Sequence, residues 1–401
     1  MTISASLPIL KLKQQRSKPF WQGESLVFSG ALDTKQKEPT DIQLVLVAEH
    51  TGAVLGCGFY NPHSSYRVRL IEHGKAPLSD LSEILKKRFQ AAIDFRKSIG
   101  LPSDQESNQT NAYRLVNSEG DSLSGLTIDV FGNHLVLAVT AAWVMKSQEI
   151  IESILKELFP DFSIHWRPNV SALKQDGWVF ESSAIPENNS NLVSILENGL
   201  AYQVDITRGQ KTGFYCDQRE NRSTLRKFAQ SRRVLDTCCY TGGFAMNAAK
   251  AGATSVLAID SSESALNIAR ENAKLNQLEN IEFQKQDVEK FLSESTELFD
   301  LIILDPPKLV PSKEKIHAGK KLYLRLNRLA LQHLSPNGML VTCSCSDAMT
   351  KELFEETLVL AATQADRKIS IKLNTGAAPD HTLQKGARFG DYLKVFWVSA
   401  E

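Results

Sequence analysis

Apolar residues recur with three different spacings along the 401-residue chain, and each spacing predicts a different kind of element. In residues 1–75 apolar and polar positions alternate. The run YRVRLIE places Arg67 and Arg69 on one face and the intervening aliphatic residues on the other, as in a strand. A second strand-like run, IQLVLVAE, precedes it across the turn-rich GCGFYNPHSS. We therefore expect a small β-rich unit at the N-terminus.

Residues 76–195 predict an α+β middle domain. Apolar residues at three- and four-residue spacing over 78–100 indicate a helix that ends in glycine, and SQEIIESILKELF indicates another. Between them, LTIDVFGNHLVLAVT is typical of a β-hairpin that turns at Gly132 and Asn133.

The pattern changes again in the third predicted domain, residues 196–401. From about residue 230, short apolar runs alternate with helical segments: RRVLDTCC, TSVLAID, IEFQKQD, FDLIILD and GMLVTCS. Strands that alternate with helices predict a doubly wound α/β domain with a mainly parallel sheet. The fold class expected for the whole chain is thus α/β, preceded by a β-rich and an α+β part.

Composition narrows the class of protein. Hydrophobic residues make up 42% and charged residues 23%, and the longest apolar runs, 134–144 and 300–307, are too short to span a bilayer. No basic segment followed by an apolar signal core begins the chain, so we expect a cytoplasmic protein without a membrane partner. The formal net charge of zero argues against a surface coated in positive charge, although not against a local basic patch.

The six cysteines do not have the spacing of a zinc site, because no CxxC pair occurs, and we expect neither a metal nor disulfides. Two of them, Cys343 and Cys345, flank a serine where the last of the apolar runs ends. Small core residues or a nucleophile are the remaining interpretations.

Acidic residues end four successive predicted strands: Asp236, Asp260, Asp287 and Asp305. The carboxyl ends of such strands meet at one crevice, which is where doubly wound sheets bind ligands. A single aspartate there is more often a helix cap, but four in succession make that interpretation poor. The fingerprint GxGxxG of nicotinamide dinucleotides is missing, and four carboxylates suit a cationic ligand without phosphates, which favours S-adenosylmethionine.

These motifs resemble a known family. The run DxxxYTGGF, followed by DPPK and SCS, is similar to class I S-adenosylmethionine-dependent RNA methyltransferases, and closest to the bacterial large-subunit (23S) ribosomal RNA cytosine-5 methyltransferases with an N-terminal PUA domain. VFSGAL and GFYNPHSSYRVRLI resemble the PUA portion. RLVNSEGDSLSGLTIDVFG resembles the middle domain, and GQKTGFYCDQRENR is specific to the family.

The resemblance implies a reaction and its residues. C5 of cytosine is a poor nucleophile, and a thiolate that adds to C6 activates it. The family places this nucleophile at Cys345 and not at Cys343. Asp305 is expected to bond the cytosine amino group or N3, and Lys308 to contact a phosphate or to lower the pKa of the thiol. Cys238 and Cys239 stand where the family has Phe-Ser, and we interpret them as packing residues.

The remaining implied sites are binding residues. Those expected to hold the cofactor are Gln218, Asp236, Tyr240, Thr241, Gly242, Gly243, Asp260, Ser261, Asp287, Val288 and Asp305. Ribosomal RNA is expected to contact Arg67, Arg69 and Tyr66, with Tyr60 as a further stacking surface.

Three other functions stay open at this point. A methyltransferase acting on a guanine or adenine nitrogen needs no thiol, a ribosome-assembly factor needs no catalytic residues, and a nicotinamide dehydrogenase would bind NAD. The sequence leaves open the modified nucleotide, the form of the RNA substrate, the base that removes the C5 proton and the oligomeric state; a neutral surface is compatible with a homodimer.

Overall fold

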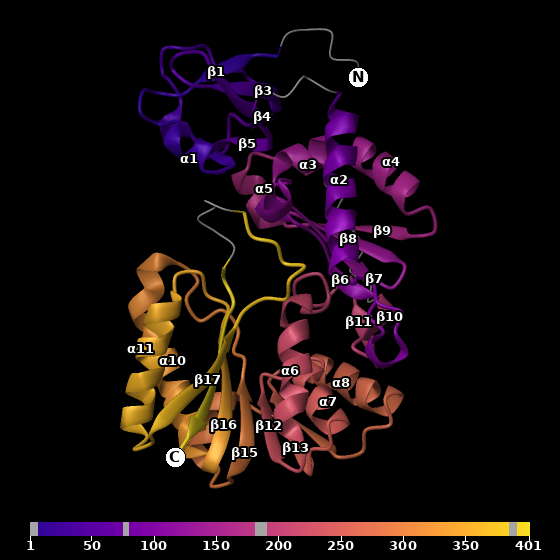
Figure 1. Ribbon diagram of the computed structural model, residues 1–401, viewed down its shortest axis with the longest axis vertical. Coiled ribbons are helices and arrows are strands. Elements are labelled where there is room, and N and C mark those ends of the chain that lie inside the picture. Colours follow the sequence, from indigo (N-terminus) through magenta and orange to yellow (C-terminus); the bar gives the residue numbers. More distant parts are fainter. Residues whose placement is uncertain (1–6, 75–79, 181–190, 385–390) are drawn as a thin grey trace.

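Three parts of the chain follow one another from the top to the bottom of the computed structural model (Figure 1). The structure describes residues 7–74, 80–180, 191–384 and 391–401. A β-rich part is followed by an α+β part and then by an α/β part. This order confirms the fold class predicted from the sequence. No helix within these described ranges is long and apolar enough to cross a membrane.

The N-terminal part is a five-stranded sheet in the order β1-β3-β4-β5-β2. Its strands are β1 (Ile9–Lys11), β2 (Leu26–Phe28), β3 (Gln43–Ala48), β4 (Val54–Tyr60) and β5 (Tyr66–His73), with the short helices α1 (Lys18–Trp21) and η1 (Ser29–Ala31).

Two glycines in β4 allow this sheet to close tightly on β5. A Cβ atom at Gly58 would lie 2.2 Å from the carbonyl oxygen of Arg69, and one at Gly56 would lie 2.3 Å from that of Glu72. Only a residue without a side chain fits at such approaches. The glycines of the GCG run, which look like turn residues in the sequence, therefore belong to a strand interior.

The middle part contains a four-stranded sheet in the order β6-β7-β8-β9, and the hairpin predicted at Gly132 and Asn133 is confirmed. The strands are β6 (Ala112–Asn117), β7 (Leu126–Phe131), β8 (His134–Val139) and β9 (Ser163–Pro168). The helices are α2 (Leu81–Ser98), η2 (Glu106–Asn108), η3 (Ser118–Asp121), α3 (Ala142–Lys146), α4 (Gln148–Leu158) and α5 (Val170–Gln175). The helices expected near 78–100 and 147–159 are α2 and α4; residues 78 and 79 lie outside the described ranges.

The first two parts share one hydrophobic core. Phe59 of β4 stacks on Trp143 of α3, with ring centroids 4.5 Å apart, and Ile71 of β5 joins the same buried cluster as Leu85 of α2. Because apolar side chains from both parts fill this core, the N-terminal sheet is held on the middle part by packing rather than by a linker alone.

A separate antiparallel pair, β10 (Leu192–Glu197) and β11 (Leu200–Asp205), leads to the last part. The predicted domain boundary between residues 195 and 196 falls inside β10. β10 pairs with β11 in a hairpin that turns at Asn198 and Gly199. A domain boundary inside β10 would divide this hairpin.

The C-terminal part is a seven-stranded sheet in the order β14-β13-β12-β15-β16-β18-β17, in which β18 is antiparallel to both its neighbours. The order reverses between β12 and β15, which is where doubly wound sheets form ligand sites. The strands are β12 (Arg233–Thr237), β13 (Ser255–Asp260), β14 (Ile281–Lys285), β15 (Phe299–Leu304), β16 (Leu334–Ser344), β17 (Ile369–Thr375) and β18 (Lys394–Ala400).

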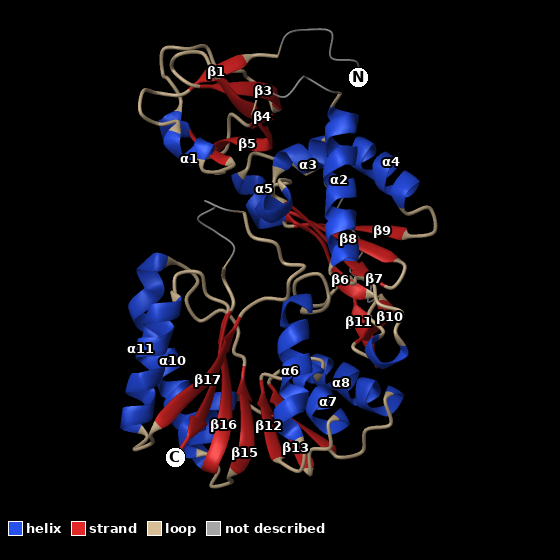
Figure 2. Cartoon of the chain, in the orientation of Figure 1, coloured by secondary structure: helices blue, strands red, loops and turns tan. Residues whose placement is uncertain are grey.

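Helices cover both faces of this sheet (Figure 2). One buried cluster joins the sheet to α6, α7 and α8, and another joins it to α9, α10 and α11. The bounds are η4 (Cys216–Gln218), α6 (Arg219–Ala229), α7 (Gly243–Lys250), α8 (Glu263–Leu275), α9 (Val288–Glu294), η5 (Lys313–Lys315), α10 (Ile316–Gln332) and α11 (Lys351–Gln364).

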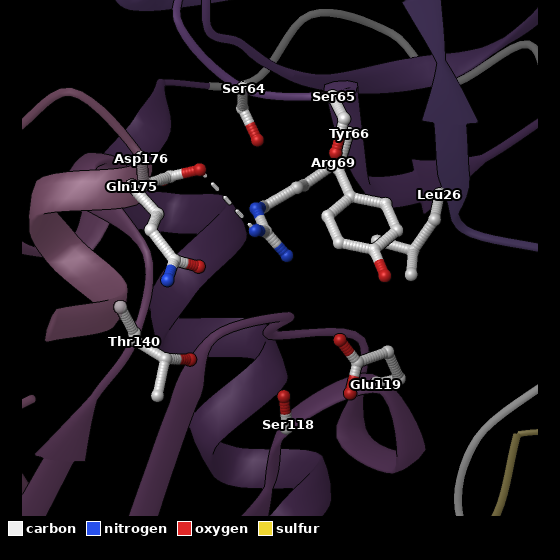
Figure 3. A pocket seen from close by; sticks show the side chains of 11 residues that line it. Leu26, Ser64, Ser65, Tyr66, Arg69, Ser118, Glu119, Thr140, Gln175 and Asp176 are labelled. Atoms are coloured by element: carbon white, nitrogen blue, oxygen red, sulfur yellow. Dashed lines mark ion pairs between the residues drawn. The ribbon is translucent and has the colours of Figure 1, made fainter. Parts of the chain in front are cut away.

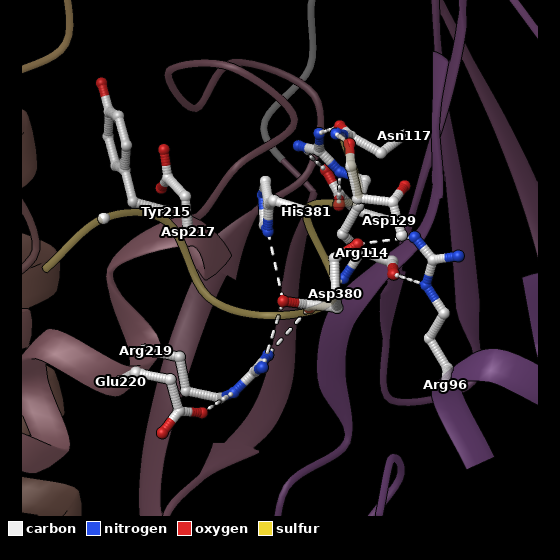
Figure 4. A network of polar contacts seen from close by, with 12 residues as sticks. Arg96, Arg114, Asn117, Asp129, Tyr215, Asp217, Arg219, Glu220, Asp380 and His381 are labelled. Atoms are coloured by element: carbon white, nitrogen blue, oxygen red, sulfur yellow. Dashed lines mark hydrogen bonds and ion pairs between the residues drawn. The ribbon is translucent and has the colours of Figure 1, made fainter. Parts of the chain in front are cut away.

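The segment 376–384, after β17, returns to the middle part and ties the two together (Figures 1 and 4). Asp380 in this segment accepts both terminal guanidinium nitrogens of Arg219, at 2.9 and 3.1 Å, and the backbone N–H of Arg114 in β6 at 2.8 Å. Nearby, Asn117 donates to the carbonyl of Thr382 at 2.9 Å. The loops around the sheet's carboxyl edge are thus anchored to the middle part.

Candidate active site

A cavity of about 710 Å³ opens at the carboxyl ends of the parallel strands. Its size is in the range of small-molecule sites. The loops after β12, β13, β14, β15 and β16 line it, together with the segment 209–218. Eleven of the predicted cofactor or catalytic residues are on its wall: Gln218, Tyr240, Thr241, Gly243, Asp260, Ser261, Asp287, Val288, Asp305, Lys308 and Cys345.

The loop after β12 turns back sharply beside the cavity. Cys238 and Tyr240 have φ of 57° and 50°, and Gly242, at φ 84°, caps α7 without lining the cavity. Cys239 is buried in the core, as its packing interpretation requires, whereas Cys238 lines the cavity. The two cysteines therefore have different surroundings.

The acidic residues after β12 and β13 both bind backbone N–H groups. The Asp260 carboxylate accepts the N–H of Tyr240 at 2.8 Å and that of Ser262 at 2.9 Å. Asp236 lies below the cavity wall, buried, and accepts the N–H of Ala245 at 2.9 Å. Burial raises the pKa of Asp236 well above its ordinary value.

Asp287, after β14, caps α9 by accepting the N–H of Lys290 at 2.9 Å and also lines the cavity. The helix-cap interpretation, which four aspartates in succession made poor, therefore applies to Asp287, while the N-caps of α7 and α8 are Gly242 and Ser262. These backbone hydrogen bonds use only part of a carboxylate's acceptor capacity, so Asp260 and Asp287 can still present oxygen to a ligand.

The cavity wall carries more acidic than basic side chains. Its acidic residues are Asp217, Asp260, Asp287, Glu289, Asp305 and Asp347, and its basic residues are Lys211, Arg222 and Lys308. This set fits a cationic ligand without phosphates. Asp260 and Asp287 offer acceptors for ribose hydroxyls and an adenine amino group, and Val288 offers an apolar surface, so the residues present fit S-adenosylmethionine.

The two cysteines of the SCS region differ in access. Cys345 directly follows β16, is half-buried and lines the cavity, whereas Cys343 is fully buried and accepts a hydrogen bond from Gln218 Nε2 at 3.6 Å. Burial and the charge of Asp305 raise the pKa of the Cys345 thiol, and the charge of Lys211 lowers it. Only Cys345 of this pair presents its thiol to a ligand.

Asp305 stands beside this thiol at the start of the DPPK turn. Gln218 Nε2 donates to its Oδ2 at 2.9 Å. Burial and the neighbouring charge of Asp217 raise the pKa of Asp305 to about 6. A carboxyl group with this pKa can carry or release a proton near neutral pH.

Lys308 does not have the surroundings of a residue that activates the thiol. Its Nζ pairs with Asp347 at 2.8 Å, and its side chain is 44% exposed. Lys211, from the segment 209–218, is a lysine whose charge lowers the pKa of Cys345. Lys211 belongs to the run GQKTGFYCDQRENR, one of the motifs in which the chain resembles the family. The sequence does not show which residue of this run faces the cavity.

The residues predicted to bind RNA are less exposed to solvent than the strand pattern suggests. Arg69 is 9% exposed; its Nη1 donates to Ser124 Oγ at 2.8 Å and its Nη2 lies 3.6 Å from Asp176. Figure 3 shows Arg69 and Tyr66 on the wall of a second cavity, of about 370 Å³, between the N-terminal and middle parts.

Tyr60 and Arg67 are held within the N-terminal part. Tyr60 is buried, contrary to its expected role as a stacking surface, and its hydroxyl donates to Glu38 at 2.7 Å. Arg67 Nε lies 3.5 Å from the same carboxylate. The alternation correctly predicts a strand, but the packing of the middle part on this sheet decides which residues stay exposed.

Two family models match parts of the chain. Residues 182–372 match the model of S-adenosylmethionine-dependent methyltransferases, and residues 10–73 match that of PUA-like domains. The resemblance expected from the motifs is confirmed for both ends of the chain.

Curated relatives match nearly the whole length. "Ribosomal RNA large subunit methyltransferase I" from Salmonella paratyphi B is 35% identical over 395 residues, which cover 97% of this chain and 96% of the relative. The protein of the same name from Klebsiella pneumoniae has the same identity and covers 97% of each.

Solved structures agree with the fold. "A putative sam-dependent methyltransferase from Streptococcus mutans" has a TM-score of 0.79 and 25% identity, and covers 98% of this chain and 100% of its own. A methyltransferase structure complexed with SAH has the same TM-score at 24% identity and the same coverage, and supports the fold alone.

Proposed function

The chain belongs to the family of S-adenosylmethionine-dependent large-subunit ribosomal RNA methyltransferases I, and we propose that it methylates C5 of a cytosine in 23S ribosomal RNA through a covalent adduct with Cys345. The observation that carries this proposal is the position of the thiol. Cys345 lies on the cofactor cavity beside Asp305, while Cys343, two residues earlier, is fully buried.

The cofactor is held by residues around the switch point of the sheet. Asp260 would accept from the ribose hydroxyls and Asp287 from the adenine amino group, and Val288 would offer an apolar surface to the adenine ring; all three residues line the cavity. Tyr240, Thr241 and the glycine turn form the wall beside them. When bound, S-adenosylmethionine supplies an electrophilic methyl group on a cationic sulfur.

The side chains of the cavity account for the activation of the base. The Cys345 thiolate adds to C6 of the cytosine, which forms a C6–S bond and places electron density on C5. Asp305, protonated in part near neutral pH, donates its proton at N3 and neutralises the ring. After C5 has gained the methyl group, a base takes the C5 proton and the C6–S bond breaks, which restores the C5=C6 double bond and the free thiolate. N3 returns its proton to the Asp305 carboxylate. A nitrogen-directed methyltransferase would have no use for this thiol.

The PUA-like part supports an RNA substrate. We propose that Tyr66, Arg67 and Arg69 contribute to RNA binding from β5 of the N-terminal sheet, with Lys308 near a phosphate at the half-exposed rim of the cavity. A cytoplasmic location and a homodimer remain predictions.

The proposal is tested with purified protein, tritiated S-adenosylmethionine and large-subunit ribosomal RNA that lacks the modification. Digestion to nucleosides identifies the labelled base. We expect label in 5-methylcytidine with the wild type and with Cys343→Ala, and none with Cys345→Ala. Label in a methylated purine that survives Cys345→Ala would replace the proposal with nitrogen methylation. No transfer by the wild type would favour an assembly factor.

A further inference from the structure

Three residues of the cofactor cavity surround the ammonium group of Lys211: Tyr215, Asp217 and Tyr392. We call these four residues together the Lys211 cluster. Lys211 Nζ lies 2.6 Å from Asp217 Oδ2, and the Tyr392 hydroxyl donates to the same oxygen at 2.6 Å. The ammonium also lies 4.3 Å from the centroid of the Tyr215 ring and 5.6 Å from that of the Tyr392 ring. A lysine held by a carboxylate and two aromatic faces has little rotational freedom.

The backbone also fixes the position of the Lys211 cluster. Lys211 has a φ of 51°, in the left-handed region that residues with side chains rarely adopt. Asp217 is buried, and its carbonyl accepts the N–H of Ala378 from the anchored segment 376–384 at 2.8 Å. Such local strain persists where the surrounding structure fixes it, and it gathers at functional sites.

Charged and titratable groups from several elements face Cys345: Asp305 after β15, Lys211, Tyr215 and Asp217 from the segment 209–218, Tyr323 on α10 and Lys394 on β18. Lys394 Nζ donates to the carbonyls of Ser346 and Tyr392, at 2.7 and 2.8 Å, and is therefore committed to the backbone. The carboxylates raise the pKa of the thiol, and the charge of Lys211 opposes them.

We propose that Lys211 is a positioning residue for the reaction, whose ammonium, fixed by Asp217 and Tyr392, stabilises the thiolate of Cys345. As the thiol releases its proton to solvent, the negative charge that forms between Asp305 and Asp217 is balanced by Lys211. The thiolate is then available to add to C6. This inference rests on the proposed function, because it requires Cys345 to act as a nucleophile.

The test measures the reactivity of the Cys345 thiol directly and needs no RNA. Full-length protein is alkylated with iodoacetamide between pH 6 and pH 10, and the rate is followed on the peptide that contains Cys345, so that the other cysteines do not interfere. A nearby opposite charge shifts a pKa by about 1–3 units, and the side chain of Lys211 is 34% exposed, so the lower end applies. Lys211→Met should therefore raise the pH midpoint by about one unit and slow alkylation below it about tenfold.

Two further variants separate charge from structure. Lys211→Arg keeps the charge and should alkylate with a midpoint close to that of the wild type. Lys308→Met removes a cation of the same cavity that is paired with Asp347, and should leave the midpoint unchanged. An unchanged midpoint in Lys211→Met, or an equal shift in Lys308→Met, would overturn the inference.

Failure of this inference is distinguishable from failure of the proposed function. If Cys345→Ala abolishes methylation while Lys211→Met alkylates like the wild type, only the role of Lys211 is wrong. If Cys345→Ala still methylates RNA, the thiol mechanism itself is wrong, whatever the alkylation midpoint shows.

Discussion

Asp380 holds the segment 376–384 both to α6, through its ion pair with Arg219, and to β6 of the middle part, through the N–H of Arg114. The side chains of Arg219 and Asp380 are buried, at 3% and 0% exposure, and the carboxylate accepts two guanidinium nitrogens as well as the N–H of Arg114. Asp380→Ala removes these three contacts together with the hydrogen bond to His381 Nδ1 at 3.2 Å, and leaves a guanidinium group without its buried partner (Figure 4).

The magnitude follows from these contacts. Breaking a buried pair costs about 3–5 kcal/mol, and a buried N–H left without an acceptor adds about 1–3 kcal/mol. Arg219 keeps a second contact, with the half-exposed Glu220 at 3.1 Å, which offsets part of the loss. We therefore expect Asp380→Ala to lower the free energy of unfolding by about 4 kcal/mol at pH 7.

The pH dependence has a definite sign. Burial raises the pKa of Asp380, but the hydrogen bond with His381 and the charge of Arg219 outweigh it and hold this pKa below its ordinary value. A carboxyl with a lowered pKa stabilises the fold above its unfolded-state pKa of about 4, and this contribution is lost as the pH falls towards the folded-state pKa. The difference between wild type and Asp380→Ala should thus be full at pH 7 and shrink below about pH 4.

The assay is urea unfolding followed by circular dichroism at pH 7 and at pH 3.5. Glu297→Ala is the matched control, because Glu297 pairs with Arg233 in a half-exposed ion pair whose loss should cost at most about 1 kcal/mol. The reasoning is refuted if Asp380→Ala costs no more than this control, or if its cost grows as the pH falls.

Three further outcomes follow from the structure. Asp305→Asn should abolish methylation and raise the thermal midpoint at pH 8. Burial raises the pKa of this carboxyl to about 6, so its ionised form destabilises the fold once the pH has risen through that value. A lowered thermal midpoint would contradict this. Gly58→Ala should lower the free energy of unfolding by about 3 kcal/mol, since its Cβ would lie 2.2 Å from a β5 carbonyl, and a loss under about 0.5 kcal/mol in a urea titration would count against the close approach. Arg67→Gln should lower turnover on ribosomal RNA and reduce the slope of log affinity against log salt by about 1, and unchanged turnover and slope would remove Arg67 from the RNA contacts.

The pattern of apolar residues predicted the parallel strands of the C-terminal sheet. Four of the parallel strands, β12, β13, β15 and β16, carry continuous apolar runs because helices cover both faces of the sheet, and such runs can be recognised in a sequence; the fifth, β14, is only partly buried. The edge strand β17 escaped notice because its residues, among them Ser370, Lys372 and Asn374, are mostly exposed and carry no buried stripe. The fold class could therefore be predicted from the sequence, whereas the edge strand β17 could not.

The site was only partly accessible for a different reason. Aspartates at strand ends point to a ligand crevice, but whether each one faces the cavity depends on the loop that follows it. Asp236 turns into the first turn of α7, while Asp260 and Asp287 remain at the wall. No local pattern marks this difference.

Contacts between distant segments are the other missing information. Tyr392 reaches Asp217 across 175 positions of sequence, and the cover that the middle part places over Arg69 comes from Ser124 and Asp176. Tertiary packing creates these contacts, so a reading of strands and helices one at a time does not predict them.

The covalent adduct of Cys345 is tested most directly by trapping it. In large-subunit ribosomal RNA transcribed with 5-fluorocytidine, the fluorine at C5 cannot leave as a proton does, so the C6–S bond persists after methyl transfer. We predict that wild type and Cys343→Ala, given S-adenosylmethionine, form a protein–RNA complex that survives a denaturing gel, and that Cys345→Ala forms none. A complex that forms equally with Cys345→Ala, or that is absent from an active wild type, would contradict the account.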